Sequence, residues 1–163
     1  MLQPPTPCIL GIDPGTEDAA WALVTVGGSP KPLAWDRVRH NRDAAMGPAV
    51  RLALGYGAAI VLAAIEDQYV GDNRRSATQL AHQAGAWAEA CRDQGVKVAF
   101  IPPSQWQGAE LAHGPRSLVK KSTKARALER CRLVWGITDL SEHEADALLI
   151  ARYAAIEHSR RPW

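Results

Sequence analysis

The sequence predicts one mixed α/β domain, and three observations support this fold class. The chain has 163 residues, a normal size for one domain with a single core. Hydrophobic residues make up 47% and charged residues 22%, as in globular proteins. Three apolar segments come first, and two more then alternate with segments of helical periodicity. We assign the domain to residues 8–158, with a disordered leader at residues 1–7 and a frayed tail at residues 159–163.

The first three predicted strands form a meander. Residues 8–13 are a short apolar run that ends in an acid and is followed by Pro-Gly, which indicates a buried strand and then a turn. Residues 19–26 predict a second strand, residues 27–30 a turn, and residues 32–38 a third strand.

A helix, a buried strand, a long helix and a fifth strand are expected next, at residues 41–55, 58–65, 74–94 and 96–101 in that order. Apolar residues at helical spacing, such as Leu80 and Trp87, support the long helix, which Gly95 is expected to end. The strand before it is apolar throughout and leads directly into Glu66, which predicts burial on both faces.

The last third of the chain begins with an irregular segment. Residues 104–121 contain two glycines, a proline and mixed polarity, which predicts a long loop or short irregular helices. Ser122 is expected to cap a helix whose Leu128 and Cys131 share a face. A final helix is predicted over residues 142–157.

Three acids occupy special positions in these elements. Asp13 ends the first strand, Glu66 ends the fourth, and Asp146 lies in the first turns of the last helix. A carboxylate at the end of an apolar strand is costly to bury unless it is paired or ligates a cation. Carboxylate oxygens suit magnesium, and two such ions can activate water at a phosphodiester. The acids are therefore candidate metal ligands, although a single acid at a strand end often only marks where the core meets water.

His143 lies three residues before Asp146 and therefore shares its helix face. It is a candidate for metal binding or for handling the proton of a leaving group. Ser141 and Glu144 match a capping box, which favours a structural role for Glu144. Glu142 complements the helix dipole, and a role at a metal stays open for it.

A basic segment precedes an acidic cluster. Residues 113–132 contain seven Lys or Arg residues and one acid, while residues 139–146 contain four acids and no Lys or Arg. This pattern fits a site that holds metal ions beside a phosphate backbone, and the alternative is a solvated helix face. The net charge of +2 alone does not indicate a nucleic-acid partner.

At these residues the sequence resembles the RuvC family of Holliday junction resolvases, which belongs to the ribonuclease H-like superfamily. Residues 9–15 (ILGIDPG) resemble its first motif, residues 64–66 with residues 73–77 its second, and residues 143–148 its last. The resemblance extends to about residue 153. It implies a five-stranded mixed sheet, a three-stranded antiparallel meander plus two parallel strands, flanked by helices.

The resemblance also implies an activity, that of a magnesium-dependent crossover junction endonuclease that resolves four-way DNA junctions by paired nicking. Carried over by position, the catalytic and metal-binding residues are Asp13, Glu66 and Asp146, with His143 as the fourth member. Two Mg²⁺ or Mn²⁺ ions per active site and a homodimer are implied. The partner is branched DNA, and nothing in the sequence indicates which helicase, if any, acts with it.

Candidate DNA contacts follow from the same resemblance. They are Tyr69, Arg74, Arg75, Lys120, Lys121 and Lys124. Lys124 matches the family's basic residue near the scissile phosphate, and Tyr69 matches an aromatic that stacks on bases at the junction centre. The alternatives are packing of Tyr69 against a dimer partner and a solvated helix start for the arginines.

Residues 102–119 depart from the family pattern and look more like divergent phage-type members. Trp106 in this segment is interpreted as a core anchor, and the alternative is a DNA-facing aromatic. Broader cutting of branched or flapped DNA is therefore an alternative to strict resolution of junctions. A ribonuclease H-type activity, a non-catalytic nucleic-acid-binding module and an ATP-handling protein on a related fold are further alternatives.

The three cysteines, Cys8, Cys91 and Cys131, are far apart and lack metal-site spacing, which predicts buried free thiols. No apolar run is long enough to span a membrane, and residues 1–7 lack the features of a signal peptide. We therefore expect a cytoplasmic protein of a bacterial or phage-infected cell, with no membrane partner.

Overall fold

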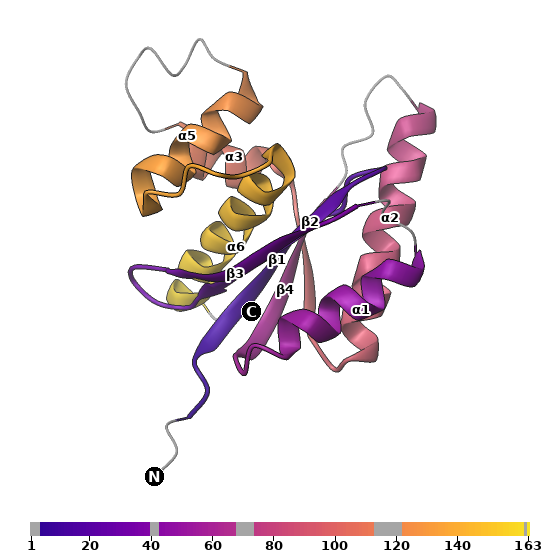
Figure 1. Ribbon diagram of the computed structural model, residues 1–163, viewed down its shortest axis with the longest axis horizontal. Helices are drawn as coiled ribbons and strands as arrows, with labels where there is room; N and C mark the ends of the chain where they lie inside the picture. Colours follow the sequence, from indigo (N-terminus) through magenta and orange to yellow (C-terminus); the bar gives the residue numbers. More distant parts are fainter. Residues whose placement is uncertain (1–3, 40–42, 68–73, 113–121, 162) are drawn as a thin grey trace.

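The computed structural model describes residues 4–39, 43–67, 74–112, 122–161 and 163 (Figure 1). Its five strands form one sheet in the order β3-β2-β1-β4-β5. The strands are β1 (Pro7–Asp13), β2 (Ala19–Thr25), β3 (Pro32–Val38), β4 (Ala59–Glu66) and β5 (Val98–Ile101). The pairs β1–β2 and β2–β3 are antiparallel, whereas β1–β4 and β4–β5 are parallel. The predicted α/β class, a meander plus two parallel strands, is confirmed.

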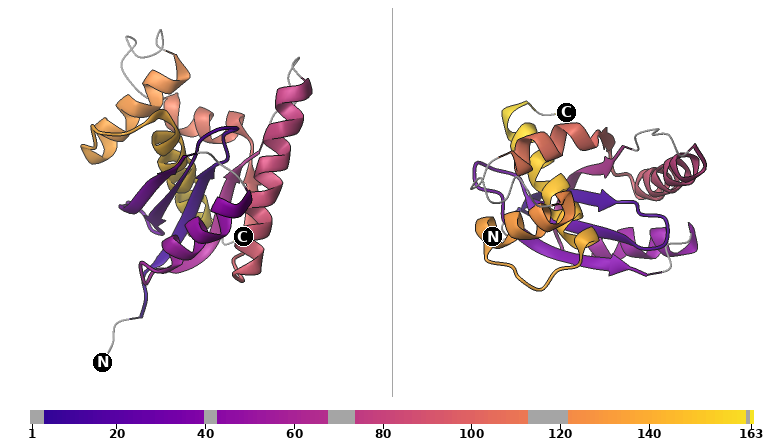
Figure 2. Two further views of the ribbon diagram at one scale, coloured as in Figure 1. Left: turned by 45° about the vertical axis from the view of Figure 1, so that its right-hand side comes forward. Right: turned by 90° about the horizontal axis from the view of Figure 1, so that it is seen from above.

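Helices cover both faces of this sheet, as the views in Figures 1 and 2 show. They are α1 (Asp43–Leu54), α2 (Arg74–Asp93), α3 (Pro103–Leu111), α5 (Thr123–Trp135) and α6 (Glu142–Arg160). One core lies between the sheet and α1 and α2, and the other lies between the sheet and α3, α5 and α6. Both sheet faces are therefore covered, which is why β1 and β4 are apolar up to the acid that ends each strand.

Alternation along β1 assigns its side chains to the two cores. Leu10 and Ile12 belong to the core under α1 and α2, whereas Ile9 belongs to the core under α6. Gly11 also faces α6, and a Cβ built on it would lie 2.3 Å from the carbonyl oxygen of Ala147. Because no real Cβ approaches a backbone atom so closely, the glycine permits the close packing of α6 on β1.

The largest difference from the sequence prediction is α3. Residues 104–121 were expected to be a loop or irregular helices, but residues 103–111 form one regular helix with Pro103 in its first turn. Its inward side chains include the charged Glu110, which is 2% exposed, so the apolar pattern that reveals a helix is weak here. Residues 113–121 lie outside the described residues.

The chain ends also differ from the prediction. Pro7 already belongs to β1, and the Thr6 carbonyl accepts a hydrogen bond from the Ala59 N–H at 3.0 Å, inside the expected leader. Helix α6 continues to Arg160, inside the expected tail. The other helix and strand ends shift by a residue or two, as terminal turns commonly do.

The predicted thiols are confirmed, since all three cysteines are buried and free. Burial raises the pKa of Cys91 and of Cys131 to about 12, which keeps both thiols protonated. Within the described residues, no helix combines the length and the apolarity that crossing a membrane requires.

Candidate active site

Strand register brings the first two acids together. Ile12 of β1 lies beside Ile65 of β4 in parallel register, so the next residues, Asp13 and Glu66, end neighbouring strands at the same edge of the sheet. Side chains alternate along a strand, and Ala64, two residues before Glu66, belongs to the core under α6. Both carboxylates therefore face the side of the sheet on which α6 packs.

The start of α6 supplies the other two predicted residues. The Ser141 side chain accepts a hydrogen bond from the Glu144 N–H, and the Glu144 carboxylate accepts one from the Ser141 N–H at 2.8 Å. This capping box, predicted from the sequence, defines the first turn of the helix. His143 and Asp146 follow on one face, and the close packing of α6 on β1 brings that face over the strand ends.

The four predicted residues line one pocket of about 350 Å³. Among the described residues, the lining consists of Asp13, Gly15, Thr16, Glu66, Leu80, Lys124, Glu142, His143 and Asp146. Residues that are far apart in the sequence, on β1, β4 and α6, thus converge as the sequence analysis expected. Leu80 of α2 adds an apolar side chain to the lining. From the sequence, this residue was expected only to contribute to the apolar face of its helix.

Asp13 and His143 contact each other directly across this pocket. The His143 Nδ1 lies 2.7 Å from an Asp13 carboxylate oxygen, and Asp13 is only 7% exposed. This hydrogen bond to a carboxylate raises the pKa of His143, because the negative charge stabilises the protonated ring. The site therefore favours an imidazolium at its mouth when no other cation is present.

Glu66 accepts a hydrogen bond from a residue that is distant in the sequence. The Trp106 Nε1–H donates a hydrogen bond of 2.9 Å to the Glu66 carboxylate. Trp106 is completely buried, so its interpretation as a core anchor is confirmed and the alternative of a DNA-facing aromatic is wrong. No local signal could have revealed this bond, because the two residues are 40 positions apart and meet only through the packing of α3.

Asp146 is a buried carboxylate of this pocket with a strongly raised pKa. Burial, and then the negative charges of Asp13 and Glu66, raise the pKa of Asp146 from 3.8 to about 8. Its Oδ1 is buried and has no hydrogen-bond partner within the part of the chain that the structure describes. A buried carboxylate oxygen without a partner is expensive, so this position favours a bound cation.

The donor set of the pocket fits a divalent metal ion. Three carboxylates and an imidazole are ligands that Mg²⁺ or Mn²⁺ accepts, and the unpartnered oxygen of Asp146 points to a missing partner. Among the described residues, no three His, Cys, Asp or Glu side chains are already close enough together to hold a metal ion. Asp13 contacts His143, and Glu66 contacts Trp106, within this donor set.

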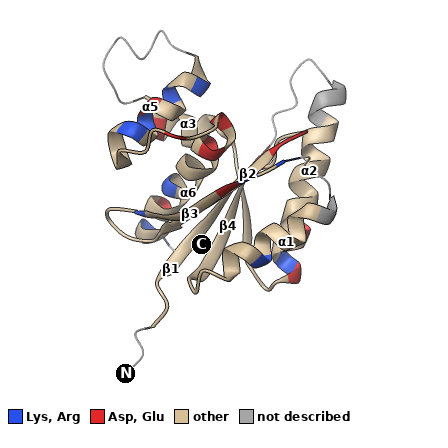
Figure 3. Ribbon diagram, in the orientation of Figure 1, with Lys and Arg blue, Asp and Glu red and all other residues tan. Residues whose placement is uncertain are grey.

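Lys124 and Glu142 form the rim of the pocket. The Lys124 ammonium lies 2.6 Å from the Glu142 carboxylate, and the lysine side chain is 64% exposed. This hydrogen bond to Glu142 raises the pKa of Lys124. Lys and Arg recur along α5 (Figure 3), and of these side chains Lys124 lines the pocket, whereas Arg130 and Arg132 pair with Glu110 and Glu129.

The other predicted DNA contacts are not placed by the structure. Tyr69, Lys120 and Lys121 lie outside the described residues. Arg74 and Arg75 form the first turn of α2, but their side chains are also outside the described part. Their roles stay predictions.

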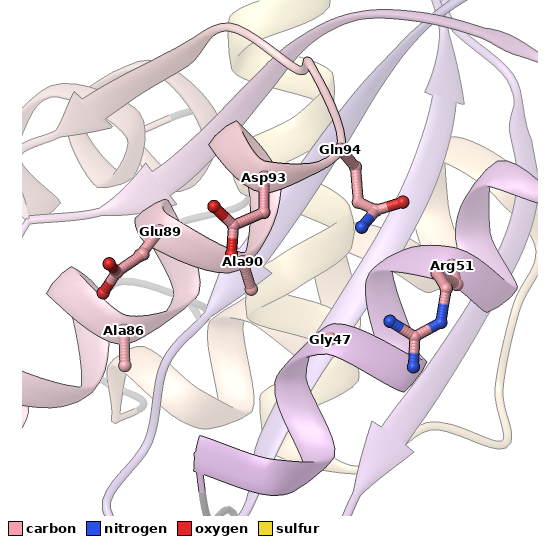
Figure 4. Close-up of a pocket in the computed structure, with 7 residues that line it drawn as sticks. All are labelled: Gly47, Arg51, Ala86, Glu89, Ala90, Asp93 and Gln94. Atoms are coloured by element: carbon pink, nitrogen blue, oxygen red, sulfur yellow. The ribbon is translucent and has the colours of Figure 1, made fainter.

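A second hollow of about 260 Å³ lies between α1 and α2. Figure 4 shows Arg51 on α1 across this hollow from Glu89 and Asp93 on α2. None of the predicted site residues whose side chains the structure describes lines it, and its helices cover the sheet face opposite α6. The acidic pocket is therefore the candidate active site.

Comparisons with known proteins agree with this site. No family model matches the chain. A protein named crossover junction endodeoxyribonuclease RuvC from Halorhodospira halophila is 32% identical over 151 residues, which cover 88% of this chain and 86% of the relative. Another of that name from Zymomonas mobilis is 29% identical over 159 residues, which cover 92% and 91%.

The fold also matches solved structures. Thermus thermophilus RuvC, solved in complex with a Holliday junction substrate, superposes with a TM-score of 0.75 and 23% identity, over 95% of this chain and 97% of that one. This match supports the fold, and the sequence relatives support the family. The chain belongs to the RuvC family of crossover junction endodeoxyribonucleases.

Proposed function

We infer that this protein is a structure-specific DNA endonuclease that resolves Holliday junctions. Its relatives are named for this activity, and a structure of the same fold was solved on such a junction. The observation that carries the inference is the convergence of Asp13, Glu66, His143 and Asp146 in one pocket. Such a set of acidic and imidazole side chains is suited to hydrolysis of a phosphodiester.

Asp13, Glu66 and Asp146 are the proposed ligands of two Mg²⁺ or Mn²⁺ ions, with His143 as a fourth ligand or as a proton donor. Held by these residues, such ions would supply an activated water and a positive charge near the departing 3′ oxygen, and the product would carry a 5′ phosphate. The raised pKa of Asp146 supports this assignment, because a carboxylate that is difficult to ionise alone gains most from a neighbouring cation.

The hydrogen bond with Asp13 orients the imidazole ring of His143. Because Nδ1 contacts the Asp13 carboxylate, this bond also sets the direction in which Nε2 points. In its protonated form the ring can donate a proton to the departing 3′ oxygen, and in its neutral form it can ligate metal. In both cases the buried Asp13 fixes where the imidazole stands.

Lys124 is the proposed contact for the scissile phosphate. Its ammonium stands at the rim of the pocket and is exposed to an incoming strand, although it is paired with Glu142 in the absence of DNA. A DNA phosphate that displaces Glu142 would form an ion pair with Lys124 beside the metal site. This contact to the backbone is independent of base sequence. A homodimer would present two such pockets for paired nicking, and this assembly and the cytoplasmic location stay proposals.

A cleavage panel tests the function. The substrates are a four-way junction, a flap, a fork, a plain duplex and an RNA–DNA hybrid, each with and without Mg²⁺. We expect nicking of the junction in Mg²⁺ and none in EDTA. Preferential cutting of the hybrid would instead support a ribonuclease H-type activity, and equal cutting of flaps and forks would support broader specificity.

The variant Asp13→Asn tests the site. It should abolish cutting and preserve or strengthen binding of the junction, because it removes a ligand and a negative charge beside the phosphate. Asp93→Asn is the matched control, since Asp93 lies at the second hollow on the other side of the sheet. Full cutting by Asp13→Asn would contradict the proposed role of the pocket.

A further inference from the structure

Helix α3 lies in a segment whose sequence predicts a loop or short irregular helices. It begins at Pro103, two residues after β5 ends at Ile101, and β5 pairs directly with β4 through Glu66 and Ile101. The helix therefore starts next to the strand end that carries Glu66. Of the residues lining the pocket, none comes from α3, so any influence of this helix passes through another side chain.

The contact that connects α3 to the site is the bond from Trp106 to Glu66. The indole Nε1–H donates to the carboxylate at 2.9 Å, and the ring is completely buried among α3, α5, α6 and the sheet. A buried indole has few alternative orientations, and its single N–H points in one direction. The bond therefore restricts the orientation of the Glu66 carboxylate.

Helix α3 is itself held by a buried ion-pair network. Glu110, one turn after Trp106, accepts hydrogen bonds from Arg152 of α6 at 2.5 and 2.6 Å and from Arg130 of α5 at 3.3 Å. Both arginine side chains are largely buried. Because α6 also carries His143 and Asp146, the same network links the helix that orients Glu66 to the helix that supplies the other site residues.

We propose that Trp106 is a positioning residue, which holds the Glu66 carboxylate in the orientation that metal ligation and cleavage require. This inference rests on the proposed nuclease function and deepens it. Groups that hydrogen-bond to metal ligands fix ligand orientation, and their loss typically lowers metal affinity or activity by roughly 10- to 100-fold. A merely structural tryptophan would lower stability without such a selective effect.

The test compares Trp106→Phe with Trp87→Phe. Both tryptophans are completely buried, but Trp87 packs in the core on the opposite sheet face. Within the described residues, its Nε1–H has no hydrogen-bond partner. Both variants remove a similar ring volume, and Trp106→Phe also removes a hydrogen bond, so it should lose somewhat more stability than Trp87→Phe in urea denaturation. Only Trp106→Phe should lower kcat for junction cleavage, by about tenfold, with KM unchanged.

Two measurements without DNA make the test independent of cleavage. Calorimetric titration with Mn²⁺ alone should show about tenfold weaker binding for Trp106→Phe than for Trp87→Phe. In ¹H–¹⁵N spectra, the indole signal that disappears in Trp106→Phe should shift when Mg²⁺ is added to the wild-type protein, and the Trp87 signal should not.

The outcomes are distinct. If Trp106→Phe binds Mn²⁺ and cuts junctions as Trp87→Phe does, or if the Trp106 signal ignores Mg²⁺, the positioning role is refuted. If the wild-type protein cuts no junction, the proposed function fails, but the ion titrations still decide whether Trp106 acts on Glu66. If the wild-type protein cuts junctions and both ion responses appear, both inferences hold.

Discussion

Replacing Asp146 by Asn should stabilise the metal-free protein while it destroys cleavage. The wild-type carboxylate is buried beside the charges of Asp13 and Glu66, and one of its oxygens has no hydrogen-bond partner within the described residues. Ionisation of Asp146 therefore destabilises the folded state unless a cation neutralises the charge. Asn keeps the shape of the side chain and removes the charge.

The magnitude follows from the pKa of Asp146. The unfolded chain ionises this group near 3.8, whereas the folded protein holds its proton until about pH 8. Between these values the folded state binds more protons than the unfolded state, so the free energy of unfolding falls as the pH rises. At about 1.36 kcal/mol for each unit, the loss over this window is on the order of 5 kcal/mol. Asn still buries a polar group, which costs about 1–3 kcal/mol, so the net gain at pH 8.5 should be about 2–4 kcal/mol.

Urea denaturation followed by tryptophan fluorescence, from pH 5 to 9 in EDTA, measures this effect. The wild-type protein should lose stability over that range, and Asp146→Asn should lose much less. Mg²⁺ should restore stability to the wild-type protein at high pH, because binding to the folded state favours the ionised carboxylate. The reasoning is refuted if Asp146→Asn is no more stable than the wild-type protein at pH 8.5, or if both show the same pH slope.

Two further substitutions probe how α6 and α3 are held. Gly11→Ala should destabilise the protein by about 3 kcal/mol, because the new Cβ meets the backbone of α6, whereas Gly85→Ala, with no atom within 4 Å of its Cβ, should not destabilise it in the same urea titration. A Gly11→Ala protein as stable as the wild type would show that α6 can shift without penalty. Glu110→Gln leaves Arg152 and Arg130 without their buried counter-charge and should lower the free energy of unfolding by about 3 kcal/mol. An unchanged urea midpoint for this variant would mean that the network does not hold α3.

Much of the fold was predictable because its signals are local. The strand over residues 8–13, the turn that follows and the buried strand before Glu66 each combine apolar residues with a clear end. The capping box of Ser141 and Glu144 likewise lies within four residues. Asp13 and Glu66 end apolar strands and Asp146 lies in the first turns of the last helix, and these positions alone group the three acids as candidate ligands.

The sequence by itself therefore determined the order of the elements and the acids that end them, since these depend on neighbours in the chain. Only the tertiary structure decided that Trp106 bonds to Glu66, that Gly11 admits α6, and that Asp146 lies buried beside two other carboxylates. Each of these features joins segments 40 or more residues apart. Packing at that range depends on how whole helices dock on the sheet, and the docking of α3 through the buried charge of Glu110 leaves little trace in the local apolar pattern.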